Sequence, residues 1–367
     1  MNCDDETYRR GYTPRIRVRS RPRIQAVFRS VIRMSGAIAI SKIAAILALV
    51  LVSEFSAGEV LPDITRPTSI TVVLSRGDRP YEASVSALRE VVDRANLKAA
   101  PVINTFTITG TNSDLKTELR QTKPDLVVTV GAIAARQVKA WGIRAPTLCI
   151  LLPRQAFQAI WTPSGGLTRI AHPAGAVVLD QPALRQLRLV RMLNLKRPRV
   201  ALLSGKLTQS AVAPFQKNAD DLGIALHDVN LDNSDEPVAA LRKAIAENDV
   251  ILALPDPGTI TPQHAKWLLY MAYQRSRPVL AYSQAFVDAG AIAAVYSTPA
   301  QIGREAGEII VRVLSDPDSS MDYLLAMRYP RYFTVGTNRS VARSLGIQLP
   351  DATAMTAELQ RMESSEK

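Results

Sequence analysis

Short apolar runs alternate with amphipathic helical segments from residue 69 onward. The clearest helical pattern covers residues 81–97, where Val85, Leu88, Val91, Val92 and Ala95 fall on one face. The apolar runs are near-continuous, which is typical of strands buried on both faces. They cover residues 70–74, 102–108, 126–130, 147–152, 200–203, 225–229, 250–253, 279–282 and 292–295. Because parallel strands need a long crossover, this alternation predicts an α/β protein with parallel sheets flanked by helices.

The pattern breaks once, at residues 153–176, which are rich in Pro and Gly. A helix over residues 181–193 and a new first strand at Val200 then restart the alternation. Two strand and helix sets separated by a loop-rich join predict two lobes, each an open α/β sheet.

Residues 277–314 carry the most explicit local signals. A strand over residues 278–282, a polar turn and a second apolar run ending at Val295 precede a helix. Thr298 is the expected N-cap, Pro299 fits the first helical position, and Gln301 stands three residues after the cap, where its side chain reaches back. The expected apolar face of this helix consists of Ile302, Ala306, Ile309, Ile310 and Val313.

Several segments together resemble a known family. They are S-x-A-F-V-x-A-G-A at residues 283–291, S-T-P-x-Q-I-G-R-E-A at 297–306, LDQP at 179–182, ALPDP at 253–257 and YPRYFTVGTNRSVARSLGIQLP at 329–350. Residues 67–350 thereby resemble the periplasmic substrate-binding proteins of ABC transporters, in the branch with the type I periplasmic-binding-protein fold. The resemblance implies two lobes joined by a hinge, with a solute bound in the cleft between them.

The resemblance also implies a division of the chain. Residues 67–178 and 284–328 are expected in lobe I, because the chain is expected to cross back near Ser283. Residues 179–283 are expected in lobe II, with 329–350 returning across the hinge, and residues 351–367 are expected to form a disordered tail.

The order of residue types in the first 58 residues is typical of an export signal. They hold nine arginines and one lysine against four carboxylates, which is half of the net charge of +12. A basic lead through Arg33 precedes an apolar run at 43–52 and the small residues Ser56, Ala57 and Gly58, so we expect cleavage near Ala57 or Gly58 and a periplasmic protein. Counting the apolar run from Ala37 leaves an uncleaved membrane anchor open, and Met34 is an alternative start. The remaining charge is spread without a dense basic run, so no nucleic-acid partner is expected.

Candidate ligand-binding residues follow from the topology. In open parallel sheets a ligand lies beyond the carboxyl ends of the strands, and this rule selects the loops after the strands. The candidates are Ser75, Arg76, Gly77, Gly131, Ala132, Pro153, Ser204, Asp256, Tyr282, Ser283 and Gln284. Turns require many of the same residue types, so ordinary turn chemistry is the alternative for each loop.

The charges among these candidates suggest a ligand class. The Arg76 guanidinium and the backbone N–H groups of Gly131 and Ala132 favour an anionic group, while Asp256 suits an ammonium or hydroxyl donor. A zwitterionic or anionic solute is therefore expected, with a plain sugar or nucleoside as the rival.

Catalysis has little support in the sequence. His172, His227 and His264 are isolated from one another and from other ligands at metal-binding spacing, and no nucleotide-binding or hydrolase motif occurs. Asp180 and Asp256 could be imagined as an acid and base pair, but no motif supports this. We therefore expect no enzyme activity, no cofactor and no metal.

The cysteines fit an exported protein, and a monomer is expected. Cys3 lies in the leader and Cys149 lies in an apolar run, so no intramolecular disulfide is expected in the mature chain and Cys149 is expected to be buried and inert. The expected partners are a small-molecule ligand and an inner-membrane ABC permease. A sensory module that signals to a membrane receptor or kinase is the alternative, because the same fold serves both.

Overall fold

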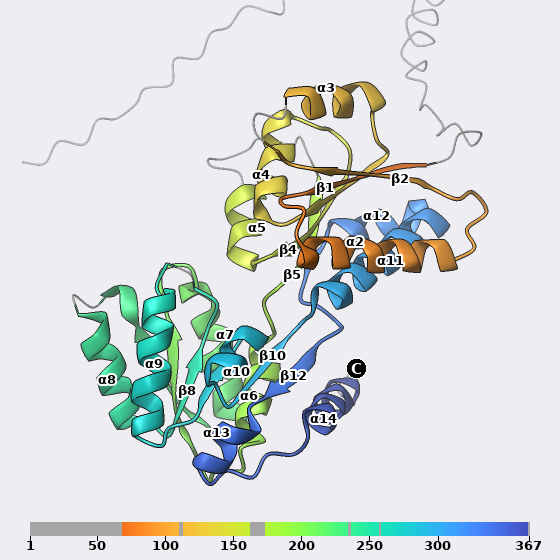
Figure 1. Ribbon diagram of the computed structural model, residues 1–367. Helices are drawn as coiled ribbons and strands as arrows, with labels where there is room; N and C mark the ends of the chain where they lie inside the picture. Colours follow the sequence, from red (N-terminus) through yellow and green to blue (C-terminus); the bar gives the residue numbers. More distant parts are fainter. Residues whose placement is uncertain (1–67, 110–112, 162–172, 234–235, 257, 366–367) are drawn as a thin grey trace, which may run out of the picture. The chain divides into compact units, whose positions relative to one another are not determined.

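The described residues form two sheets, and the first of them is entirely parallel (Figure 1). The computed structural model describes residues 68–109, 113–161, 173–233, 236–256 and 258–365. The strand order is β11 (Met327–Arg328), β5 (Ala174–Val178), β4 (Thr147–Leu152), β3 (Leu126–Val130), β1 (Ser69–Leu74) and β2 (Val102–Thr107). The predicted strand β1 thus lies inside the sheet, where the side chains of Ile70 and Val72 are fully buried.

The second sheet is parallel except at one edge. Its order is β12 (Thr334–Thr337), β10 (Ala293–Tyr296), β9 (Val279–Ala281), β8 (Val250–Ala253), β6 (Arg199–Ser204) and β7 (Ala225–Asn230). β12 pairs antiparallel with β10, whereas β10 is parallel to β9. Both sheets belong to one compact unit, Arg66–Lys367.

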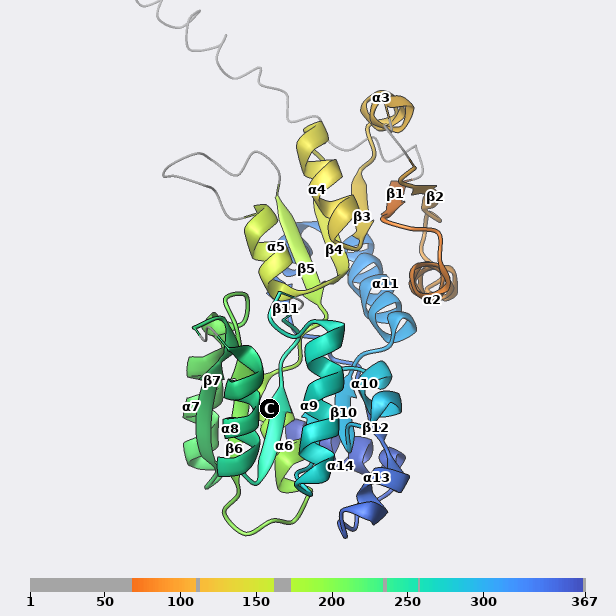
Figure 2. The same ribbon diagram turned by 60° about the vertical axis from the view of Figure 1, so that its left-hand side comes forward.

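Helices cover both faces of the first sheet (Figure 2). α2 (Arg79–Arg94), α11 (Pro299–Ser315) and α12 (Pro317–Leu325) pack on one face, and α3 (Ser113–Thr122), α4 (Ala132–Trp141) and α5 (Arg154–Trp161) on the other. The contact between α11 and α2 depends on a glycine, because a Cβ on Gly303 would lie 2.0 Å from the carbonyl oxygen of Ser84.

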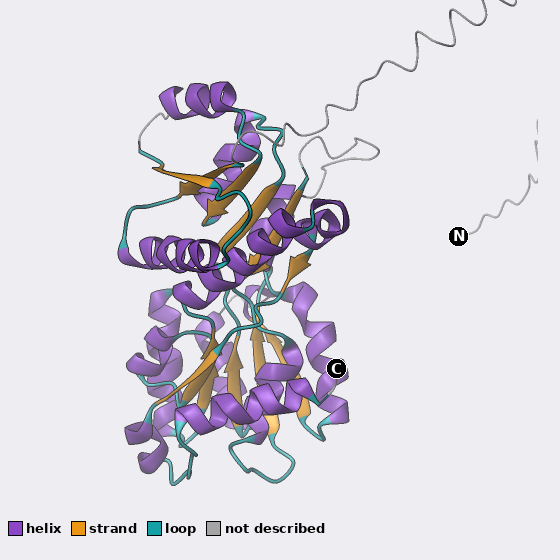
Figure 3. Cartoon of the chain, turned by 90° about the vertical axis from the view of Figure 1, so that its right-hand side faces the viewer, coloured by secondary structure: helices purple, strands orange, loops and turns teal. Residues whose placement is uncertain are grey.

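The second sheet is also covered on both faces (Figure 3). α6 (Ala183–Arg191), α7 (Gln209–Asp221), α13 (Arg339–Ser344) and α14 (Ala352–Ser364) pack on one face. The short η1 (Leu231–Asn233), α8 (Pro237–Glu247), α9 (Pro262–Gln274) and α10 (Gln284–Ala289) belong to the other. The alternation along β6 produces this arrangement, since Val200 and Leu202 face the first group while Ala201 and Leu203 face the second.

The start of α11 is as the sequence predicts. Thr298 Oγ1 accepts the backbone N–H of Gln301 at 3.2 Å, and the Gln301 side chain accepts the N–H of Thr298 at 2.9 Å. The five predicted apolar residues of this helix are buried against the first sheet. The predicted capping box and apolar face are therefore confirmed.

The chain crosses between the sheets at different points from those expected. β10 pairs with β9 and β12, so it lies in the second sheet, and the chain returns to the first sheet at Ser297 rather than near Ser283. We call residues 179–182, 297–298 and 329–333 the crossing segments, because each joins an element of one sheet to an element of the other. Periodicity alone could not locate the return, because β10 and β9 are equally apolar.

The end of the chain is helical where a disordered tail was expected. Asp351 caps α14 by accepting the N–H of Thr353, and Met355 and Leu359 are buried in the core of the second sheet. These two apolar residues are four positions apart and lie on one helix face. Because that face is buried, the segment forms a helix although most of its residues are polar.

Three strands of the described chain, β5, β11 and β12, have no counterpart among the predicted apolar runs. β5 and α5 lie in or beside the Pro- and Gly-rich join, β11 precedes the YPRYFTVG segment and β12 lies in it. The predicted leader at residues 1–58 lies outside the described residues. Within the described part of the chain, none of the helices combines the length and the apolar character needed to span a membrane.

Candidate functional site

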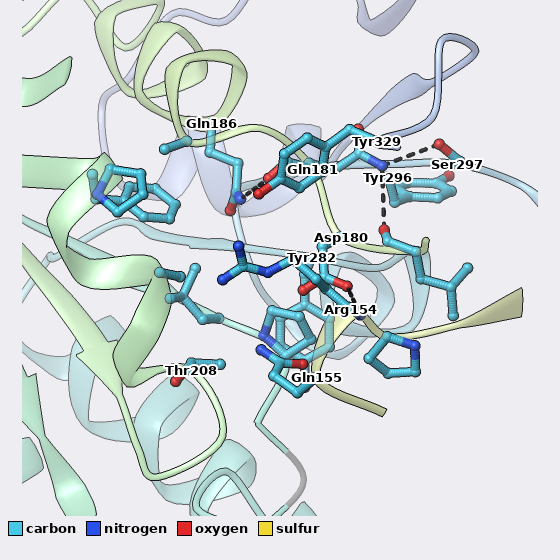
Figure 4. Close-up of a pocket in the computed structure, with 18 of the residues that line it drawn as sticks. Arg154, Gln155, Asp180, Gln181, Gln186, Thr208, Tyr282, Tyr296, Ser297 and Tyr329 are labelled. Atoms are coloured by element: carbon cyan, nitrogen blue, oxygen red, sulfur yellow. Dashed lines mark hydrogen bonds between the residues drawn. The ribbon is translucent and has the colours of Figure 1, made fainter. Parts of the chain in front are cut away.

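A cavity of about 400 Å³ lies where the crossing segments meet the carboxyl ends of strands from both sheets (Figure 4). This position, and a volume of this order, are typical of small-molecule sites in open α/β proteins. Its lining residues are Pro153, Arg154, Gln155, Leu179, Asp180, Gln181, Ala183, Gln186, Thr208, Ala211, Pro214, Phe215, Leu254, Pro255, Tyr282, Ser283, Tyr296, Ser297 and Tyr329.

The walls of the cavity are mainly apolar and aromatic. Phe215 and Leu254 come from the core of the second sheet, and the rings of Tyr282, Tyr296 and Tyr329 complete the lining. Burial raises the pKa of Tyr282 and of Tyr296, so both phenols stay protonated at neutral pH. The arrangement suits a solute with an apolar or flat body.

Gln284 orients one of these aromatic rings without lining the cavity. The hydroxyl of Tyr296 donates to Gln284 Oε1 at 2.6 Å, and Gln284 Nε2 donates to Asp288 Oδ1 at 2.7 Å. This residue, predicted to bind the ligand, therefore lies behind Tyr296.

Among the described side chains that line the cavity, only that of Asp180 is a carboxylate. It follows β5 and accepts the backbone N–H of Arg154, the first residue of α5, at 2.6 Å. Burial raises the pKa of its carboxyl group above the ordinary value of 3.8, and the hydrogen bond from Arg154 opposes that shift. A partly desolvated carboxylate of this kind is stabilised by a cation or by further hydrogen-bond donors.

Arg154 supplies the cavity's cationic side chain, but its guanidinium group reaches across to α7. Its Nη2 donates to Ser210 Oγ at 3.0 Å, which links α5 on the first sheet to α7 on the second. No ion pair between Arg154 and Asp180 occurs among the described side chains.

A buried amide network forms the cavity's other polar end (Figure 4). Gln181 Nε2 donates to Ser297 Oγ at 3.0 Å, and the Ser297 hydroxyl donates to the carbonyl of Tyr332 at 2.6 Å. Gln186 Nε2 donates to the carbonyl oxygen of Gln181 at 2.9 Å. The network ties all three crossing segments together, since Gln181, Ser297 and Tyr332 each belong to a different one.

Arg185 anchors this network from behind. It is 4% exposed, and its Nη1 donates to Gln181 Oε1 at 2.6 Å and to the carbonyl of Pro330 at 3.0 Å. Its Nε and Nη2 donate to the two carboxylate oxygens of Glu363 on α14 at 2.6 and 2.7 Å. The guanidinium also lies 3.8 Å from the ring centre of Phe333. The C-terminal helix is thus bonded to the residues that position the cavity.

Only part of the predicted site lines the cavity. Pro153, Tyr282 and Ser283 do so. Arg76 and Gly77 are exposed in the loop after β1, and Ala132 packs beside α5 at the start of α4.

Ser75 and Gly131 have a structural role at the start of α4. Ser75 Oγ accepts the backbone N–H of Ala134 at 2.8 Å, so it caps the helix in place of the side chain that Gly131 lacks. Gly131 has φ of +90°, and a Cβ there would lie 2.6 Å from Ser75 Oγ. This helix start does not line the cavity, so the cavity does not support the prediction that it contacts an anionic ligand.

Asp256 and Ser204 also lie away from the cavity lining. Asp256 is 1% exposed, and its carboxylate accepts the N–H groups of Leu207, Thr208 and Thr259 and the hydroxyl of Thr208, at 3.1 to 3.2 Å. Ser204 donates to Asp228 Oδ1 at 2.5 Å. Asp256 stabilises the loop before α7, because its oxygens are occupied by donors of the same lobe.

Most polar residues of the cavity were not predicted from the sequence. Arg154, Gln181, Gln186 and Ser297 were not among the candidates, and Asp180 was considered only as half of an acid and base pair. One signal was present, because Asp180 and Gln181 lie in the LDQP segment that carried the family resemblance.

Among the described residues, no group of His, Cys, Asp and Glu side chains is arranged to bind a metal ion. His172 lies outside the described residues.

Residues 190–360 match the family model described as "ABC transporter substrate binding protein". The resemblance to ABC transporter substrate-binding proteins is confirmed. No curated protein sequence matches this chain significantly. A cavity of a size suited to a small solute is consistent with this similarity to binding proteins.

Two solved structures illustrate the shared fold. An ABC domain in complex with L-Trp from Streptococcus pneumoniae is 18% identical, with a TM-score of 0.51 over 79% of this chain and 98% of that chain. The ligand-free, open structure of a substrate-binding protein with adhesive properties from Clostridium difficile is 14% identical, with a TM-score of 0.61 over 77% and 96% of the two chains. Together with the two helix-flanked sheets, these similarities confirm the two-lobed type I periplasmic-binding-protein fold.

Proposed function

We propose that this protein captures a small organic solute in the cavity beside the crossing segments, outside the cytoplasm, and delivers it to an ABC permease. The observation that carries the proposal is the cavity itself, which lies at the carboxyl ends of strands from both sheets and is lined by three tyrosines. The family match supports the solute-binding role and the permease as the partner.

Hinge closure is the proposed mechanism. Each crossing segment contributes to the cavity or to the network behind it, so a solute there contacts residues of both sheets. A ligand that binds one arrangement of the sheets better than another shifts the population toward it. The permease would then recognise the ligand-bound form.

The lining favours a solute with an apolar body and little net charge. Arg154 and Asp180 contribute one charge of each sign, and the walls are apolar. A zwitterionic solute remains our proposal. Arg154, in place of Arg76, would bind its anionic group, and Asp180, in place of Asp256, would bind its ammonium group. The complex of the Streptococcus pneumoniae relative with L-Trp is consistent with a solute of this kind.

A ligand screen with a cavity-blocking variant tests the proposal. Purified protein is screened by thermal shift against amino acids, nucleosides, sugars and small organic acids, because a ligand that binds only the folded state raises the melting temperature. Ala211→Phe fills the cavity and should abolish the shift, while Ala213→Phe, at an exposed position on the same helix, should retain it. Equal shifts in both variants would place binding elsewhere.

Uptake of the identified solute tests the permease part separately. Cells lacking the protein should lose high-affinity uptake of that solute. Unchanged uptake, together with a lost transcriptional response to the solute, would favour the sensory alternative.

A further inference from the structure

The orientation of the Gln186 side chain is determined by its hydrogen bond. Gln186 lies on α6, is 5% exposed and lines the cavity. Its amide group faces the backbone carbonyl of Gln181 at 2.9 Å. A carbonyl oxygen only accepts, so the NH₂ end of the amide must face it and the Oε1 end must face away.

This orientation leaves a buried acceptor without a partner. Gln186 Oε1 has no hydrogen-bond donor among the described residues, although the side chain is more than nine-tenths buried. Buried acceptors of this kind are rare in folded proteins and destabilise them. A donor on a bound solute would satisfy this acceptor.

Asp180 is a second acceptor in the same cavity. Of the described protein groups in other residues, the backbone N–H of Arg154 bonds its carboxylate, and a carboxylate has room for about four donors. The Arg154 guanidinium instead donates to Ser210. The positive charge of Arg154 still lowers the pKa of Asp180, but it forms no direct ion pair with it among the described side chains, so the carboxylate has room for a ligand donor.

The donors along the cavity are mostly engaged within the protein. The hydroxyl of Tyr296 donates to Gln284, that of Ser297 to the Tyr332 carbonyl, and Gln181 Nε2 to Ser297. Arg154 keeps guanidinium N–H groups besides the one bonded to Ser210, and these can meet an acceptor on the same solute, while the groups on Gln155, Tyr282, Ser283 and Tyr329 both donate and accept. Gln186 Oε1 and the Asp180 carboxylate are the acceptors of the lining that call for a donor on the ligand.

We propose that the cavity selects a solute bearing a protonated amine, with Gln186 Oε1 and the Asp180 carboxylate as its acceptors. An ammonium group offers three donors and no acceptor, and its charge compensates the carboxylate, whereas a hydroxyl supplies one donor and no charge. The tyrosine rings of the walls also attract a cation. Gln186 is thus a specificity-determining residue, and this assignment rests on the proposed function of the cavity.

Calorimetric titration with two matched probes tests the assignment. 2-Phenylethylamine and 3-phenylpropionate share a phenyl body and a two-carbon chain but end in a donor and an acceptor respectively. The wild type should bind the amine at least about tenfold more tightly. Gln186→Met should weaken amine binding about tenfold and change acid binding less than about twofold, because it removes one hydrogen bond to a charged group. Gln216→Met, an exposed residue on α7, serves as the control and should change neither.

The possible results separate the assignment from the proposed function. Tighter binding of the acid by the wild type, or equal losses for both probes in Gln186→Met, would overturn the assignment. Hits in the thermal-shift screen that are confined to amines would support it, and hits without any N–H donor would overturn it while leaving the solute-binding function intact. A screen without any hit would contradict the proposed function and, because it rests on that function, the assignment of Gln186 as well.

Discussion

Asp180 and Asp256 occupy similar places in the two sheets but have different surroundings. Each follows an apolar strand and accepts backbone N–H groups near the start of a helix. Asp256 is 1% exposed and is held by four donors of its own lobe, whereas Asp180 lines the cavity and receives one donor from the backbone of Arg154. A carboxylate at a strand end is therefore a ligand-binding candidate only when the fold leaves one of its oxygens without a partner.

The largest expected effect is on Asp256. Asp256→Ala should lower the free energy of unfolding by about 4 kcal/mol, because it leaves several buried donors before α7 without an acceptor. Asp180→Ala should cost about 1 kcal/mol, the usual value for one lost helix-start bond. Urea denaturation of both variants measures the difference. If the two variants lost equal stability, Asp256 would not be the structural member of the pair.

A third carboxylate extends the comparison to the C-terminal helix. Glu363→Ala should lower the free energy of unfolding by about 3 kcal/mol, because it leaves the buried Arg185 guanidinium without its counter-charge. Glu358→Ala on the same helix removes an exposed pair with Arg361 and should have no measurable effect. Similar denaturation midpoints for the two variants would show that α14 is not anchored through Arg185.

The smallest expected effect concerns the pH dependence of stability. Burial raises the pKa of Asp180 in the folded state, so the charged form destabilises the fold above that pKa and the penalty disappears as the pH falls toward 3.8. The wild type should therefore gain stability relative to Asp180→Asn when the pH is lowered from 7 to 4. Urea denaturation at several pH values measures this difference. A relative loss for the wild type would mean that Asp180 is stabilised as an anion in the ligand-free protein.

The fold was largely predictable because its signals are local. Strand burial, helix periodicity and the capping box at Thr298 depend on residues within a few positions of one another. The return of the chain at Ser297 and the order of α14 depend on pairing and packing with distant elements, which a periodic pattern does not reveal.

The site was less predictable than the fold for the same reason. The rule of strand carboxyl ends selected correct loops, and Pro153, Tyr282 and Ser283 do line the cavity. It did not reach Asp180, because β5 was not among the predicted strands, and it could not show that the donors around Asp256 belong to its own lobe. The unpaired oxygen of Gln186 is equally invisible in the sequence, since it follows from a bond to the Gln181 backbone.

A crystal structure of the protein with a solute from the thermal-shift screen tests the central claim most directly. We expect density in the cavity between Tyr282 and Tyr296, with a ligand donor within hydrogen-bond distance of Asp180 and Gln186 Oε1. Density beside Arg76 and Gly131 instead, with the cavity filled only by water, would contradict it.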